Sequence, residues 1–211
     1  MNPVPSEFWP WLALAGLGAF HGLNPAMGWL FAVALGLHRH NRRLVWLSPL
    51  PVALGHALSI AMVAGAFLWA GLVIDLHAVR IGAGLFLIGW ALYHWRYGYR
   101  HRVRVGMQMG LAALAVWSFL MATTHGAGLI LWPVLMPLCF PAASEPSFIG
   151  PFLTALLGIG IHTLAMLTVT TAVAVAVYEW IGLEILRRAW LNLDLVWTLA
   201  LLLAGGLLLL G

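Results

Sequence analysis

The stretch FHGLNPAMGW, residues 20–29, decides the fold, because it places a histidine and an asparagine–proline pair inside a long apolar run. A second histidine–glycine pair occurs in THGAGLILW, residues 124–132, and a tryptophan follows each pair seven or eight residues later. Ionisable residues inside a membrane segment are costly and mark function by default. The recurrence therefore predicts two related halves, each with a polar interruption.

The composition indicates a membrane protein. Hydrophobic residues make up 63% of the chain, charged residues 8%, and the mean hydropathy is +0.98, whereas soluble proteins carry roughly a quarter charged residues. A helix needs about 20 apolar residues to cross a bilayer. Six apolar runs meet this length and predict six transmembrane helices; they cover approximately residues 9–37, 44–71, 78–97, 107–139, 149–178 and 189–210.

The charged residues between these runs predict the orientation. Nine of the ten basic residues, all arginines, fall in three segments that six spans would place on one side: 38–43, 94–104 and 179–188. By the positive-inside rule that side is the cytoplasm, so both termini lie outside. Arginine without lysine is typical of a GC-rich bacterial genome, so we expect a multi-pass protein of the bacterial inner membrane.

Two other features exclude alternative classes. The sequence pI near 10 comes from loop arginines and reflects membrane orientation, so we expect no nucleic-acid partner. A lone cysteine, Cys139, excludes an internal disulfide and a dithiol relay.

The buried histidines support the division into halves. His56 follows His21 by 35 residues, and His162 follows His125 by 37. Each half has three spans, an odd number, so the second half would enter the membrane upside down. We therefore predict an all-α fold of two inverted three-helix repeats, residues 1–105 and 106–211, with a binding site near the midplane where they meet.

The first and fourth spans are predicted to be kinked or discontinuous. Asn24–Pro25 interrupts the first, since proline removes a backbone hydrogen bond, and Thr124 with Gly126 surrounds the histidine of the fourth. Both runs exceed one straight crossing. Unwound backbone at this depth is tolerated where it lines a cavity and can offer carbonyl and amide groups to a substrate.

This pattern resembles the lysine-exporter superfamily of small six-helix transporters. The resemblance rests on the three-plus-three arrangement, on His21 followed by the break at Pro25, and on the Gly-His-x-x-Ser element that contains His56. It is nearest to the nickel/cobalt efflux and hydrogenase-accessory branches, although nickel/cobalt members carry a denser cluster of histidine and acid, and Asn24 stands here where an acid is expected. The resemblance implies a small transporter.

Four histidines near the bilayer centre are predicted to converge on one metal site. Imidazole suits zinc, copper, nickel and cobalt, and protons compete for the same nitrogens, which would couple metal release to proton uptake. We expect a secondary transporter and no enzyme, with a transition metal as substrate and no resident cofactor. The predicted metal ligands are His21, His56, His125 and His162; the predicted substrate or outer-shell residues are Asn24, Ser59 and Thr124; the predicted helix breaks are Pro25 and Gly126.

Three alternatives stay open from the sequence. The chain could export an amino acid or another small organic solute of the same superfamily, or hold two haems through its four histidines as an electron-transfer cytochrome. Each histidine could also serve only as a hydrogen-bonding contact between helices. The partners expected are the lipid bilayer and a small ion or solute. A homo-oligomer is compatible with the sequence, which does not specify the number of subunits.

Overall fold

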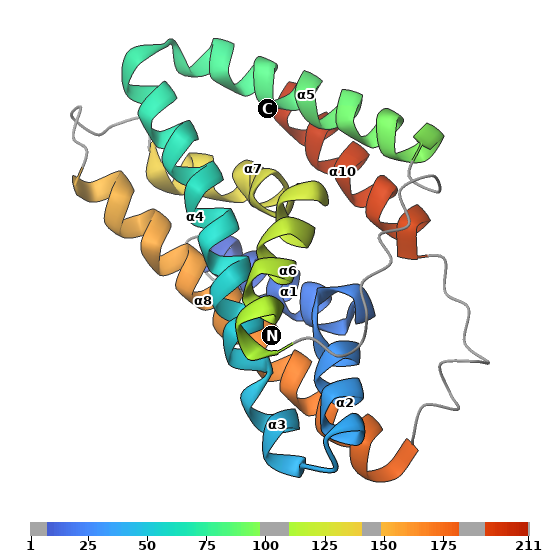
Figure 1. Cartoon of the computed structure of the whole chain (residues 1–211). Coiled ribbons are helices and arrows are strands. Elements are labelled where there is room, and N and C mark those ends of the chain that lie inside the picture. The colour runs from blue at the N-terminus through green and yellow to red at the C-terminus, as the bar shows by residue number, and fades with distance from the viewer. Residues whose placement is uncertain (1–7, 98–109, 141–148, 182–192, 211) are drawn as a thin grey trace, which may run out of the picture.

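A computed structural model describes residues 8–97, 110–140, 149–181 and 193–210, and every regular element within them is helical (Figure 1). The predicted boundary between the halves at residues 105–106, and the loop arginines beyond residues 97 and 181, lie outside the described residues. The elements are α1 (Trp9–Leu23), η1 (Pro25–Met27), α2 (Trp29–His38), α3 (Arg42–Leu47), α4 (Pro49–Val73), α5 (Leu76–Tyr97), α6 (Leu111–Thr124), α7 (Ala127–Cys139), α8 (Ile149–Ala176), η3 (Val177–Ile181) and α10 (Leu193–Leu210).

The all-α prediction is confirmed, and several helices are suited to a membrane. Three helical stretches are long and apolar enough to cross one, Arg42–Gly71, Leu76–Tyr97 and Ile149–Trp180, and α6 with α7 makes a fourth if this bent pair is one span. Six spans are not confirmed by length and composition, because a break divides the first predicted span into α1 and α2, of 15 and 10 residues.

The outer surface is apolar. Large hydrophobic side chains stand exposed along the long helices, including Leu54 and Leu58 on α4, Leu85 on α5 and Leu164 on α8, each more than half exposed. Soluble proteins rarely expose contiguous apolar patches of this kind. The surface is therefore suited to contact with lipid.

Both predicted helix breaks occur. The helix α1 ends at Leu23, Asn24 is extended, and Pro25 begins the single turn η1. The second break separates α6 from α7 at His125 and Gly126, where the axis bends by 65°. Gly126 has a φ of +69°, a conformation in which a side chain would be strained.

The helices pack in three close pairs. The first is α1 with α8, which run parallel, since Leu14 lies beside His162 and Gly22 beside Thr170. The second is α4 with α6, also parallel, with Val52 bonded to Ser118.

The third pair is α5 with α10, which lie side by side (Figure 1). At their crossing, Gly84 and Gly205 face each other's carbonyl oxygens. Small residues permit such close approach of helix backbones inside membranes. Glycine thus sets the spacing at this crossing.

One end of the helical body, its charged end, carries an ion pair. Arg42, at the start of α3, pairs with Glu179 in η3 at 2.5 Å, so the start of α3 and η3 lie together. At the other end Phe140, just after α7, lies against Gly71 of α4. The helix α4 therefore starts at the charged end, and α8 finishes there.

Glycines within the close helix pairs should tolerate no side chain. A Cβ on Gly18 would collide with the carbonyl oxygen of His162, and one on Gly55 with the carbonyl oxygen of Ala115. We expect Gly18→Ala and Gly55→Ala each to lower the free energy of unfolding by about 1–3 kcal/mol, the usual cost of overpacking. Thermal unfolding of the detergent-solubilised protein measures this.

The matched controls are Gly16→Ala and Gly65→Ala, where a Cβ meets nothing within 4 Å. Alanine forms helix better than glycine by about 1 kcal/mol, so these variants should be neutral or stabilised. If all four variants have the same thermal stability, the close approach of these helix pairs at Gly18 and Gly55 is contradicted.

Candidate metal centre

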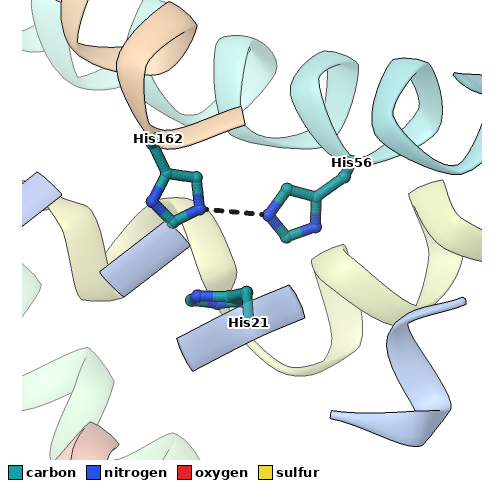
Figure 2. Close-up of side chains that lie close together, drawn as sticks. All are labelled: His21, His56 and His162. Carbon is teal, nitrogen blue, oxygen red and sulfur yellow. Dashed lines mark hydrogen bonds between the residues drawn. The ribbon is translucent and has the colours of Figure 1, made fainter. Parts of the chain in front are cut away.

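Three of the predicted histidines meet in the interior, each carried by a different helix. His21 comes from α1, His56 from α4 and His162 from α8, and all three are fully buried. One ring nitrogen of each lies within 4.8 Å of those of the other two. Figure 2 shows the three rings pointing toward one another, with His56 and His162 joined by a hydrogen bond.

The ring geometry is that of a compact cluster. The Nε2 atoms of His56 and His162 are 3.3 Å apart, and the planes of the two rings are nearly parallel, with an angle of 11° between them. The ring of His21 stands edge-on to both, with centroid distances of 5.1 Å to His56 and 4.9 Å to His162. Three nitrogens therefore face one small volume.

Backbone carbonyls fix the tautomers of two of the rings. Nδ1 of His21 donates to the carbonyl of Leu17 at 2.7 Å, and Nδ1 of His162 donates to the carbonyl of Leu14 at 3.2 Å. A carbonyl only accepts, so these Nδ1 atoms carry the protons and the Nε2 lone pairs face the cluster. Metal-binding histidines usually hold their other nitrogen in this way.

His56 has a different hydrogen-bond pattern. Since Nε2 of His162 is the acceptor, Nε2 of His56 must donate across the 3.3 Å contact. Nδ1 of His56 is buried and has no hydrogen-bond partner among the described residues. An unsatisfied buried nitrogen costs about 1–3 kcal/mol, so the cluster is incomplete as it stands.

The predicted fourth ligand, His125, is not in this cluster. It ends α6, donates Nδ1 to the carbonyl of Met121 at 2.8 Å, and its ring lies beside His94 of α5 with a centroid distance of 5.7 Å. His125 is the C-cap of α6, just before the 65° bend, so the end of α6 places its ring beside α5. The expectation that all four rings converge is corrected to three.

The predicted surrounding residues have structural roles. Asn24 accepts from the backbone N–H of Ala26 and caps η1, which starts at Pro25. Ser59, one turn after His56, bonds to Thr123 at 2.8 Å, and the hydroxyl of Thr124 donates to the carbonyl of Met121. None of these hydrogen bonds involves a ring of the cluster.

His94 was missed by the sequence interpretation, which did not include it among the candidate residues. Its Nε2 lies 3.2 Å from the carbonyl oxygen of Thr124, which also accepts from Nε1 of Trp90 at 2.8 Å. The spacing of four residues between Trp90 and His94 places them on one helix face and is the signal that was available. Together they attach α5 to the end of α6.

The charge balance of the cluster depends on the broken helix. The buried polar residues of the described chain include no carboxylate. His21, however, lies two residues before the end of α1, and a helix C-terminus carries a partial negative charge of about one half. The break therefore directs negative potential toward a cation held by the three rings.

Comparison with known proteins returned no match to any family model, curated protein or solved structure. Assignment of a function to this chain rests on its own geometry.

The cap at the first break can be tested directly. Asn24→Ala removes the acceptor of the Ala26 N–H, and loss of such a cap typically lowers stability by about 1 kcal/mol. Asn24→Ser keeps a side-chain acceptor and should restore most of it. Thermal unfolding in detergent compares the two; equal destabilisation would show that another contact holds Asn24.

Proposed function

We propose that the protein is a secondary transporter for a transition-metal cation, bound by His21, His56 and His162 and moved by alternating access. The observation that supports this most is the orientation of the rings: three buried imidazoles from three helices face one volume, and two of them hold their outer nitrogen against a carbonyl. Zinc, copper, nickel and cobalt all accept nitrogen ligands of this kind.

The proposal includes six spans in two inverted repeats, as in the lysine-exporter superfamily. The helix pairs support it, since the first helix of each half runs parallel to the second helix of the other half: α1 along α8, and α6 along α4. The two pairs make contacts at nearby positions. Leu14 and Ser118 each lie seven residues before a histidine of a His-Gly pair; Leu14 contacts His162, and Ser118 contacts Val52, about one turn before His56.

A pseudo-two-fold axis then relates the halves. It would pass through the contact of His56 with His162 and through the crossing of Gly84 with Gly205. In transporters of this architecture the substrate binds on such an axis and the halves rock around it. The proposed site is at that position.

The two other functional candidates gain less support. Three rings with centroids 4.9–5.5 Å apart leave no gap for a porphyrin between two of them, which disfavours the haem alternative. A basic amino acid would call for buried acidic groups, and none is found in the described interior.

Metal binding by purified protein tests the proposal. We expect one Zn²⁺, Co²⁺ or Ni²⁺ per chain in equilibrium dialysis. Loss of an outer-shell partner of a metal ligand typically costs roughly 10- to 100-fold in affinity. His56→Ala or His162→Ala removes a ligand itself and should therefore weaken binding by at least that factor. His38→Ala, at an exposed position, is the matched control. Retention of full affinity and of proteoliposome metal uptake in His56→Ala would contradict the proposal.

The proposed orientation in the bacterial inner membrane can be mapped with thiols. In a Cys139→Ala background, the thiol of His77→Cys, beside the α4–α5 connection, should react with a membrane-impermeant maleimide on intact spheroplasts. The thiol of His40→Cys, in the arginine-bearing connection, should react only after permeabilisation. Both native side chains are exposed, so accessibility is matched. Reaction of both from one side would refute the orientation.

A further inference from the structure

His125 occupies the position in the second half that His21 occupies in the first, yet the two rings have different surroundings. Each follows the same local pattern: a histidine at the end of a helix that stops at a break, with Nδ1 bonded to the carbonyl four residues earlier, 2.7 Å in one case and 2.8 Å in the other. Only His21 joins the cluster. His125 stands beside His94 instead.

The His56–His162 pair shows the same asymmetry. Nδ1 of His162 is bonded to the carbonyl of Leu14 on α1. The equivalent bond in the other half would run from Nδ1 of His56 to the carbonyl of Ser118 on α6. That Nδ1 is a buried atom with no hydrogen-bond partner among the described residues. The unsatisfied atom is thus the counterpart of a satisfied one.

We infer that His125 is the exchange partner of His21: when the two halves swap their packing, His125 takes the third position against His56 and His162, and His21 leaves it. The inference rests on the proposed function. Two states exchanged by the pseudo-axis would be related to each other by a rotation of about 180°, and a cation would keep two of its three ligands throughout. A fixed pair with an exchangeable third ligand lets the site change its facing side without releasing a bare ion.

The contacts of α5 identify what stabilises the present state. Trp90 and His94 both donate to the carbonyl of Thr124, next to His125. These two donors fix the end of α6 against α5. Their removal should therefore raise the population of the exchanged state.

Cobalt spectroscopy of thiol variants tests the exchange. In a Cys139→Ala background, Co²⁺ bound to the three-histidine cluster should show d–d bands, and a cysteine ligand adds an intense sulfur-to-cobalt charge-transfer band because thiolates are favourable soft ligands. We expect that band in His21→Cys, the positive control for reach, and also in His125→Cys. When Trp90→Phe is added to His125→Cys, the ratio of the charge-transfer band to the d–d bands should increase until it saturates. The expected increase is about 5- to 150-fold, the range of typical conformational couplings.

The outcomes separate the two proposals. A charge-transfer band in His21→Cys with none in His125→Cys, with or without Trp90→Phe, would overturn the exchange while leaving the metal site intact. A band in His94→Cys, the neighbouring control, would show that His94 and His125 bind Co²⁺ by themselves, which also overturns it. Absence of d–d bands from the Cys139→Ala parent and from wild type would refute the proposed function and the exchange together.

Equilibrium binding provides a second readout. If the exchange occurs, His21→Ala and His125→Ala each retain one bound Co²⁺, because the other histidine can supply the third ligand. The double variant then loses affinity by at least about 10-fold relative to the weaker single variant, which corresponds to about 1.4 kcal/mol. If the cluster is static, His125→Ala matches wild type and the double variant matches His21→Ala. That result would overturn the exchange.

Discussion

The structure depends on the contact of His56 with His162, because this is where α4 and α8 meet. Its Nε2–Nε2 distance of 3.3 Å requires α4 and α8 to cross at these residues. The remaining helices are arranged around that crossing: α1 runs along α8 and α6 along α4, each close enough for a backbone carbonyl or hydroxyl to bond across. Because a membrane interior offers no water to satisfy polar groups, such internal partners are obligatory.

The broken helices give this polar centre its chemical character. A straight α1 would carry the chain past the cluster, whereas the stop at Leu23 brings a helix C-terminus next to His21. The negative end of a helix dipole near three neutral imidazoles favours a cation, although the described interior contains no carboxylate. The proline and glycine at the two breaks therefore affect the chemistry of the centre as well as its shape.

Much of this could be predicted from the sequence, because apolar runs, proline and histidine spacing are local signals. The all-helical fold, the breaks near Pro25 and Gly126, and the gathering of His21, His56 and His162 follow from them. The position of His125 does not, since it depends on where the end of α6 packs against α5, a tertiary contact that leaves no trace in hydrophobicity. His94 was missed for a related reason: its contact with Thr124 joins residues 30 positions apart.

The central claim is that three imidazoles bind one transition-metal ion. The most direct measurement is the X-ray absorption spectrum of the zinc-loaded wild-type protein in detergent. The account predicts a first shell dominated by nitrogen at about 2.0–2.1 Å, with outer-shell scattering from three imidazole rings. A shell of oxygen ligands with fewer than two imidazoles, or a protein that retains no zinc, would contradict it.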